Sequence, residues 1–250
     1  PLGDPLVLGD LVVAPIDWNT SPLGSGKTLA IAENDDDVAL FSDGSVSVWS
    51  GGESVGRDGS VRGWRSGAAV PALGFAGRWL IGVSDEGKIY RLHYGPTQPL
   101  SVEDVSARYL LAGSAVREVA ALGGALVGFV LDGRLAISDG QKLKQYDLSI
   151  RSLTGNQGRA AAIADDEVVV LDAQTDSLQR LSLPSAKWIA FASDGVLCAA
   201  TETAVYRQKD DHFESVFSVD EGQKVRGLSA GSLGLWLLLS DGIGLIADGQ

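Results

Sequence analysis

The segment Gly24–Thr28, with the sequence GSGKT, is the first feature that could do chemistry, because glycine-rich loops ending in Lys-Thr bind nucleotide phosphates. Such a loop needs a glycine where this chain has Ser21, and Pro22 has no backbone N–H to offer a phosphate. The following TLAIAENDDD has the length of a strand and an acidic turn, not of a helix whose N-terminus could face an anion. We therefore predict a loop that leads into a strand, and no bound nucleotide.

The two histidines, His93 and His212, are the residues that a Ser-His-Asp site would need. His93 lies in KIYRLHY, whose alternation predicts an edge or outer strand rather than a catalytic position. His212 lies in QKDDHFES, where Asp210, Asp211 and Glu214 could join it around a divalent ion. A charged turn between two strands explains the same residues, so we predict no catalytic residue, no metal and no cofactor here.

Two acidic clusters, Asp35–Asp37 and Asp165–Glu167, occupy equivalent positions in a repeated pattern described below. A calcium loop alternates its oxygen ligands and contains a glycine, and neither cluster has that spacing. Carboxylates from such turns could serve glycoside hydrolysis, but the sequence selects no pair. Solvated turns and a protein-contact patch are the other interpretations, and we take Asp35, Asp36 and Asp37 as candidate partner-binding residues.

Trp64 differs from the other tryptophans because Arg62 and Arg65 flank it in the glycine-rich stretch RDGSVRGWRSG. Tryptophan and arginine are enriched at binding hot spots, so we take these three residues as candidates for contact with a protein partner. The alternative is that Trp64 packs on a neighbouring sheet. Trp79, Trp188 and Trp236 fall in or beside apolar runs and are expected to pack in the core.

Composition limits the function further. The formal net charge of −12 disfavours nucleic acid as the main partner, because nucleic-acid binding needs a basic surface. No apolar run reaches the length of a membrane span, and the N-terminus has no secretory pattern, which favours a cytoplasmic location. The single cysteine, Cys198, excludes an intrachain disulfide. Because the chain contains no Met, we expect a processed form or part of a longer protein, from which a signal could be missing.

A weak internal repeat organises the whole chain. Each unit reads as a short apolar run, a small or acidic turn, an apolar run of about five residues, a polar turn and an alternating run. Aligning the middle runs on Phe41, Val83, Val130, Leu171, Ala200 and Leu239 gives spacings of 42, 47, 41, 29 and 39 residues. A four-stranded propeller blade takes about 40–45 residues. The short interval of 29 residues predicts about three strands in the fourth unit.

The local chemistry of each unit favours strands over helices. The middle runs are VALF, WLIGV, LVGFV, EVVVL, VLCAA and LWLLL. They are too short for helices and typical of strands that are covered on both faces. Asp-Gly or Glu-Gly follows four of the runs, as at Asp132-Gly133, and such pairs favour a tight hairpin because glycine adopts positive φ freely.

The stretch SDGSVSVWS, residues 42–50, resembles the end of a WD repeat, with Ser50 where the repeat has Asp. The other five units have no tryptophan at this position. The chain therefore resembles the WD-repeat-like β-propellers in outline over most of its length and in detail in one unit. The resemblance implies a binding platform, usually for proteins.

We predict one all-β domain over residues 1–250, a six-bladed β-propeller with units near 29–68, 73–117, 118–158, 159–186, 187–224 and 225–250. The strand-like segment 6–18 is expected to pair with the last unit and close the ring, which removes a free sheet edge. A seven-bladed or incomplete propeller and a β-sandwich are the alternatives.

The predicted function is non-catalytic binding of a protein partner, with acidic turns that attract basic surfaces. The alternatives are a propeller hydrolase or lyase with acidic residues at a central channel, and a sensory domain fused to a catalytic neighbour.

Overall fold

The computed structural model describes residues 6–8, 11–14, 28–34, 37–42, 44–50, 53–72, 78–95, 98–231, 234–240 and 243–247. Within these ranges the chain forms 25 β-strands and one short 3-10 helix, η1 (Ser106–Tyr109). The all-β class predicted from the apolar runs is therefore confirmed. None of the described segments is a helix long and apolar enough to cross a membrane.

The strands form six antiparallel sheets, five with four strands and one with five. In the first sheet β3 (Thr28–Asn34), β4 (Asp37–Ser42), β5 (Ser45–Ser50) and β6 (Glu53–Asp58) pair in sequence order. The second contains β7 (Trp64–Pro71), β8 (Arg78–Ser84), β9 (Ile89–Gly95) and β10 (Gln98–Asp104), and the third β11 (Val116–Gly123), β12 (Leu126–Leu131), β13 (Arg134–Ser138) and β14 (Leu143–Ser149).

The fourth sheet contains β15 (Ser152–Asn156), β16 (Arg159–Ala164), β17 (Glu167–Asp172) and β18 (Ser177–Ser182). The fifth contains β19 (Trp188–Phe191), β20 (Leu197–Ala200), β21 (Ala204–Lys209) and β22 (His212–Ser218). The sixth has the order β1-β2-β25-β24-β23, made of β1 (Leu6–Leu8), β2 (Leu11–Ala14), β25 (Ile243–Ala247), β24 (Gly234–Leu239) and β23 (Val225–Gly231).

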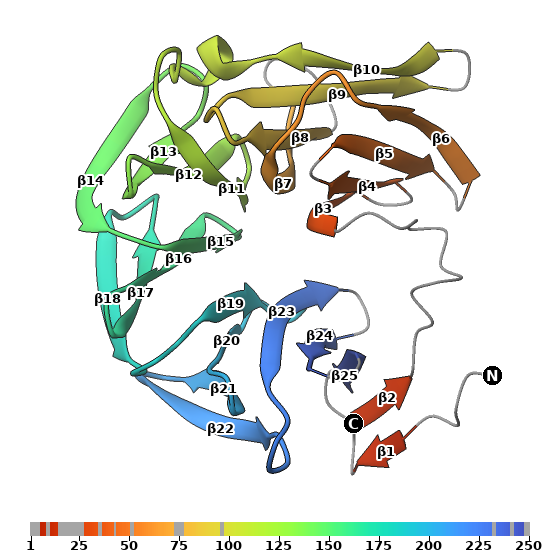
Figure 1. The fold of residues 1–250 in the computed structure, drawn as a ribbon. Coiled ribbons are helices and arrows are strands. Elements are labelled where there is room, and N and C mark those ends of the chain that lie inside the picture. The colour runs from red at the N-terminus through yellow and green to blue at the C-terminus, as the bar shows by residue number, and fades with distance from the viewer. Residues whose placement is uncertain are drawn as a thin grey trace. The chain divides into compact units, whose positions relative to one another are not determined.

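The chain divides into two compact units, Ser25–Gly158 and the combination of Pro1–Gly24 with Arg159–Gln250. In the first unit the sheets β3–β6, β7–β10 and β11–β14 follow one another, as Figure 1 shows, and share apolar cores between their faces. In the second unit the sheet β19–β22 shares its cores with β23 and β24. Stacking of consecutive antiparallel sheets is therefore the rule within each unit.

The continuous apolar runs form deeply buried strands in the middle of their sheets, as predicted: β8, β12 and β20 are the second strands of their sheets, and β17 is the third. Nearly every described residue of β8, β12, β17 and β20 is buried, because both faces of these strands are covered. The run LWLLL in β24 differs: Leu235, Leu237 and Leu239 are buried, whereas Trp236 and Leu238 are exposed. The expectation that Trp236 packs in the core is wrong, because alternation along β24 points it to the opposite face of the sheet.

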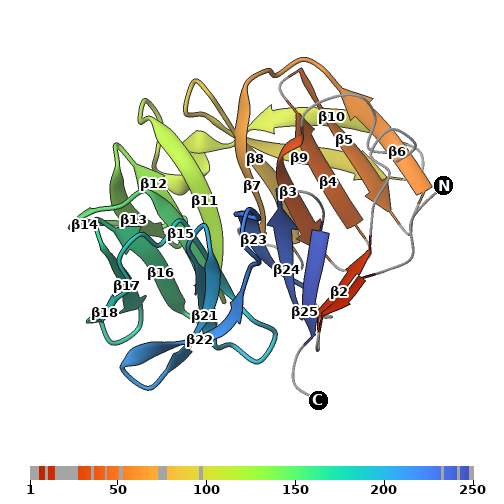
Figure 2. The same ribbon diagram turned by 60° about the horizontal axis from the view of Figure 1, so that its bottom comes forward.

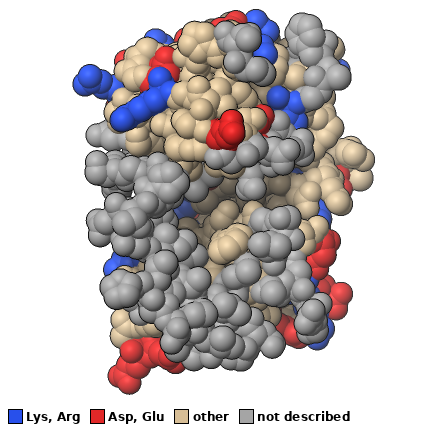
Figure 3. Space-filling model, turned by 90° about the vertical axis from the view of Figure 1, so that its right-hand side faces the viewer, with Lys and Arg blue, Asp and Glu red and all other residues tan. Residues whose placement is uncertain are grey.

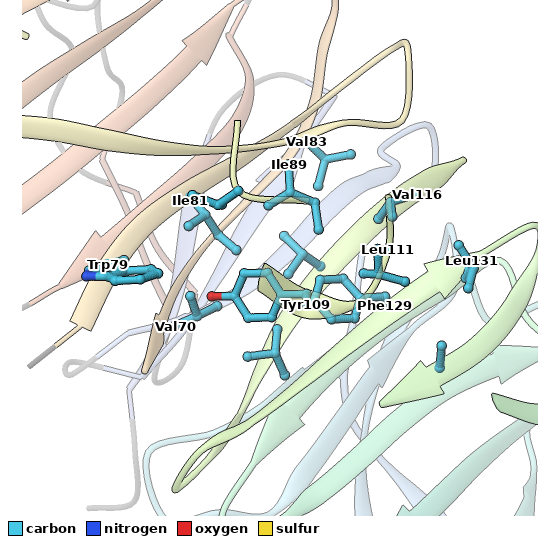
Figure 4. Close-up of a cluster of buried hydrophobic side chains, with 14 of the residues drawn as sticks. Val70, Trp79, Ile81, Val83, Ile89, Tyr109, Leu111, Val116, Phe129 and Leu131 are labelled. Carbon is cyan, nitrogen blue, oxygen red and sulfur yellow. The ribbon is translucent and has the colours of Figure 1, made fainter. Parts of the chain in front are cut away.

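The core between β7–β10 and β11–β14 is centred on the edge-to-face pair Tyr109 and Phe129, whose ring centroids lie 5.4 Å apart (Figure 4). On the other face of β7–β10, the ring of Phe41 fits over Gly67 and Gly82, which pair across β7 and β8. A Cβ at Gly82 would lie 2.4 Å from Phe41 Cε1, so the close approach of this ring requires glycine.

The N-terminal strand pairs with the C-terminal one, as expected from the sequence. Strand β2 lies antiparallel to β25, with Leu11 opposite Ile246 and Ala14 opposite Ile243, and both ribbon views show the two side by side (Figure 2). Strand β1 then extends the same sheet beyond β2.

Tight hairpins join the strands where the turn signals predicted them. Asp132 and Gly133, with φ of 50° and 77°, form the two-residue turn between β12 and β13. The fourth unit, residues 159–186, contains the three predicted strands β16, β17 and β18, but their sheet has a fourth strand. The additional strand is β15, which the repeat alignment assigned to the preceding unit. It is followed by Gln157 and Gly158, which both have positive φ.

Candidate functional site

Trp64, the candidate anchor for a protein partner, is buried with 1% of its surface exposed. Its ring packs against Phe41, with centroids 5.1 Å apart, and edge-on against Tyr90 at 5.7 Å. The alternative interpretation, packing on a neighbouring sheet, therefore describes its position. Arg62 and Arg65 are both exposed, so the part of this candidate surface that solvent can reach consists of the two arginines.

Of the acidic cluster Asp35–Asp37, only the last residue is described, and Asp35 and Asp36 lie outside the described residues. Asp37 is partly buried and accepts a hydrogen bond of 2.8 Å from the Tyr94 hydroxyl of the adjacent sheet. The equivalent position, Glu167, forms an ion pair of 2.7 Å with Arg180. The third acidic residue of each turn thus has a partner within the chain.

The GSGKT segment lies outside the described residues except for Thr28, where strand β3 begins. The prediction that a strand and not a helix follows it is confirmed. The turn between β21 and β22 also matches its prediction as a charged hairpin: Glu214 pairs with Lys209 at 2.9 Å and with His212 at 3.4 Å. No group of three or more residues in the described part of the chain could hold a metal ion.

A cluster that the sequence did not reveal surrounds Trp79 in the first unit. We name Trp79, Arg91, Glu103, Arg108 and Tyr109 the arginine–tryptophan cluster. The guanidinium carbon of Arg91 lies 4.1 Å from the centroid of the Trp79 ring, and that of Arg108 lies 5.5 Å from it. Strand pairing places Arg91 there, because it lies opposite Ile81 in β8 and therefore diagonal to Trp79 on the same face. Two guanidinium groups thus meet one indole.

Glu103 of strand β10 hydrogen-bonds two side chains, one of which belongs to the cluster. One of its carboxylate oxygens accepts a hydrogen bond of 3.0 Å from Arg108, and the other hydrogen-bonds His93 at 2.8 Å. The hydrogen bond to His93, followed by the charge of Arg108, lowers the pKa of Glu103 below its ordinary value. Both oxygens are therefore engaged with partners other than Arg91.

The 3-10 helix η1 carries Arg108 and Tyr109, and two hydrogen bonds anchor its start. The Asp104 carboxylate accepts a 3.0 Å hydrogen bond from the Ser106 backbone N–H, and the Ser106 hydroxyl accepts one of 3.0 Å from the Ile89 backbone N–H. The helix ends at Leu110, which has a left-handed φ of 63° and is 47% exposed. A leucine that is both exposed and left-handed is unusual, because its Cβ disfavours this conformation.

Two hydrogen-bond donors of the cluster are buried and have no acceptor among the described residues: the Nε of Arg91 and the hydroxyl of Tyr109. Burial raises the pKa of Tyr109 to about 12, although the charges of Arg108 and Arg91 act in the opposite direction. The hydroxyl is therefore protonated at neutral pH and can donate. The cluster offers guanidinium and phenol donors around an apolar ring, which suits an anionic acceptor.

The sequence contained one signal for this cluster. Alternation in KIYRLHY places Arg91 on the same face as the buried Ile89, and a charged side chain on a core-facing position suggests a specific partner. Nothing in the sequence shows that η1 brings Arg108 and Tyr109 to the same ring.

No protein-family model matches the chain, and no curated protein matches it by sequence. Solved structures do. A catalytically inactive virginiamycin B lyase from Staphylococcus aureus, determined with quinupristin, superposes with a TM-score of 0.64 at 10% identity, over 94% of this chain and 87% of the lyase. The WD40 domain of Neurospora crassa Pan2 has a TM-score of 0.64 at 10% identity, over 89% of this chain and 76% of that domain.

A third match, BBS1N in complex with ARL6DN, has a TM-score of 0.61 at 15% identity, over 89% of this chain and 79% of BBS1N. WD40 domains are β-propellers. The chain has a β-propeller fold. At 10–15% identity these similarities establish the fold and nothing about the propeller's ligand or activity.

One further residue of the propeller has unusual electrostatics. Glu118 on β11 accepts hydrogen bonds from the Ser152 hydroxyl and the Leu153 backbone. Its burial outweighs these bonds and raises the pKa of the carboxyl to about 7. Elsewhere on the propeller, Asp and Glu side chains lie among Lys and Arg side chains, as the face in Figure 3 shows.

Proposed function

We propose that the chain is a non-catalytic protein-interaction module, a six-bladed propeller whose last blade is completed by strand β2. The six hydrogen-bonded sheets support the blade number, and the pairing of β2 with β25 supports the closing role of the N-terminal strand. Among the similar propellers, BBS1N was determined in complex with ARL6DN, which is an interaction of the proposed kind.

The observation that carries the proposal is Leu110, exposed in a left-handed conformation directly after Arg108 and Tyr109. Aromatic residues and arginine dominate the binding energy of protein interfaces, and a strained backbone is retained where the surrounding structure or a function requires it. Leu110 and the arginine–tryptophan cluster together have the composition of such an interface.

The test is affinity capture of protein partners from a lysate of the source organism, with the purified chain immobilised. We expect one or a few proteins in amounts comparable to the chain, and a loss of about tenfold or more with Leu110→Glu, since burying a charge in an interface costs at least about 1.4 kcal/mol. Leu178→Glu is the matched control, because Leu178 is 46% exposed on β18 in the other unit.

Capture of no stoichiometric protein by the wild-type chain would contradict the interaction module. Equal capture by the Leu110→Glu and Leu178→Glu variants would keep the module and move its contact surface away from η1. A third variant with Arg62→Gln and Arg65→Gln tests the surface that the sequence suggested, since both side chains are exposed.

A propeller hydrolase or lyase is the alternative, and Glu118 is the observation in its favour. A carboxyl group with a pKa of about 7 can act as a general acid or base near neutral pH. The assay is hydrolysis of nitrophenyl esters and glycosides by the wild-type chain and by Glu118→Gln. Turnover by the wild-type chain that disappears in the variant would favour the enzyme, and no turnover by the wild-type chain above the uncatalysed rate would favour the binding module.

A further inference from the structure

We propose that the arginine–tryptophan cluster binds an acidic peptide segment of a protein partner, with Arg91 as the residue that receives the carboxylate. This inference rests on the proposed function and names the chemistry of the partner. The sequence predicted that acidic turns attract a basic partner. The present proposal is of an acidic segment instead, because the local charge of this cluster is positive although the chain as a whole is acidic.

The charges within the cluster are not balanced. Arg91 and Arg108 stand against one carboxylate, Glu103, whose two oxygens are engaged with Arg108 and His93. Within the described part of the chain, the contact of the Arg91 guanidinium is the ring of Trp79. The chain holds 32 Asp and Glu against 20 Lys and Arg, yet no carboxylate of the described residues forms an ion pair with the partly buried Arg91. A partly buried guanidinium is best stabilised by a bidentate carboxylate.

The buried atoms of the cluster that have no hydrogen-bond partner among the described residues are both donors. The Nε of Arg91 and the hydroxyl of Tyr109 are buried donors, and neither has an acceptor among the described residues. Figure 4 shows the Tyr109 hydroxyl directed toward Trp79 and Val70. Arg91 itself is partly exposed, and a carboxylate that reaches the exposed part of its guanidinium would give the cluster a charged acceptor for that group.

Leu110 selects a peptide over a free anion. Leu110 follows Arg108 and Tyr109 in the chain and is 47% exposed. A ligand that carries an apolar side chain beside its carboxylate could therefore cover Leu110 with that side chain. A segment in which Asp or Glu alternates with leucine carries both groups. An inorganic anion would use the guanidinium and leave the leucine in water.

The probe is the peptide acetyl-Gly-Asp-Leu-Glu-Leu-Gly-amide, titrated into the 15N-labelled chain at low salt. The readouts are the NMR signals of the Trp79 indole N–H and the Arg91 Nε–H. We expect saturable shifts of both signals, and we expect Arg91→Gln to weaken binding about tenfold or more because it removes the charged donor of the hydrogen bond to the carboxylate. Arg134→Gln is the control, since Arg134 is an exposed arginine that pairs with Asp147 at 3.3 Å.

The same titration with the Asn-Leu-Gln-Leu peptide, and with sodium acetate, separates the charge from the apolar contact. The proposal is overturned if the neutral peptide or acetate binds as tightly as the acidic peptide, if Arg91→Gln binds it as well as wild type, or if about 5 mM peptide shifts neither signal. Should Arg91→Gln not fold, Arg91→Lys keeps the charge without the bidentate geometry and must still weaken binding.

Failure here is distinguishable from failure of the proposed function. A partner captured by the wild-type chain and equally by Arg91→Gln keeps the interaction module and overturns the acidic-segment assignment. Capture that is lost in Arg91→Gln and competed by the acidic peptide supports both.

Discussion

Replacing Glu118 by glutamine removes a carboxyl group whose charge the fold disfavours, and this should change how stability depends on pH. Glu118 lies on β11 and is partly buried, with the Ser152 hydroxyl and the Leu153 backbone as its hydrogen-bond donors. Because burial is the larger effect, the folded chain holds the Glu118 proton with a pKa of about 7, against an ordinary value of 4.5. A glutamine of the same shape can accept the same hydrogen bonds without a charge.

The magnitude follows from the difference in proton affinity. Each tenfold difference is worth about 1.4 kcal/mol, so the gap between 4.5 and about 7 corresponds to about 3 kcal/mol. The folded state binds the proton more tightly, so between these two pH values it carries more protons than the unfolded state. The free energy of unfolding therefore falls as the pH rises from about 4.5 to about 7, and the full loss is present above that range.

The assay is urea denaturation followed by tryptophan fluorescence at pH 5, 6, 7 and 8, for the wild-type chain and for Glu118→Gln. Other carboxyl groups contribute to both proteins, so the difference between their free energies of unfolding isolates Glu118. We expect the variant to gain up to about 3 kcal/mol relative to wild type from pH 5 to pH 8. Glu221→Gln, at an exposed turn, should show no such change. Parallel curves for wild type and Glu118→Gln would refute the reasoning.

Three further substitutions test the packing around the two cores of β7–β10. Gly82→Ala should destabilise the chain by about 1–3 kcal/mol in urea denaturation, because its Cβ would lie 2.4 Å from Phe41 Cε1 and 2.6 Å from Trp64 Cζ3; unchanged stability would contradict the close approach. Tyr109→Phe removes a buried hydroxyl without an acceptor and should raise the melting temperature, by a gain of about 1 kcal/mol; a loss would contradict an unpartnered hydroxyl. Leu110→Gly relieves a φ of 63° and should raise the free energy of unfolding by about 1 kcal/mol while weakening peptide binding; a stability loss would mean that the leucine side chain packs on the fold.

The buried middle strands were predictable because one physical rule shapes them. A strand covered on both faces must be apolar throughout, and β8, β12, β17 and β20 follow that rule. Strand β24 has the same apolar composition but exposes Trp236 and Leu238, because composition does not say whether the second face of a sheet is covered. The interval of 29 residues predicted three strands in the fourth unit, and residues 159–186 contain three, β16, β17 and β18. The spacing of the middle runs does not show that β15, from the preceding unit, joins their sheet.

The arginine–tryptophan cluster could not be predicted from the sequence, because its members lie in three different kinds of structural element. Trp79 lies in a buried strand, Arg91 in an alternating one and Arg108 in a short 3-10 helix that has no periodic signature. The anchor of that helix, the Ser106 hydroxyl that accepts from Ile89, is a long-range contact between residues with no recognisable motif. Trp64 was misleading in the opposite way, since its flanking arginines suggested a surface while the strand pattern turned its ring to the core.

The location of the cluster also explains why structural similarity says so little about the ligand. A propeller needs apolar second strands and small residues where sheets approach closely, as at Gly82 under Phe41, and very different sequences can satisfy this. It does not need an arginine on β9, a carboxylate on β10 or a left-handed leucine after η1. Two chains at 10–15% identity can therefore share every sheet and differ at each of these positions. Arg91, Glu103 and Leu110 are therefore the positions at which the proposed binding would distinguish this chain from other propellers, and the peptide titration of the wild-type chain and Arg91→Gln tests it.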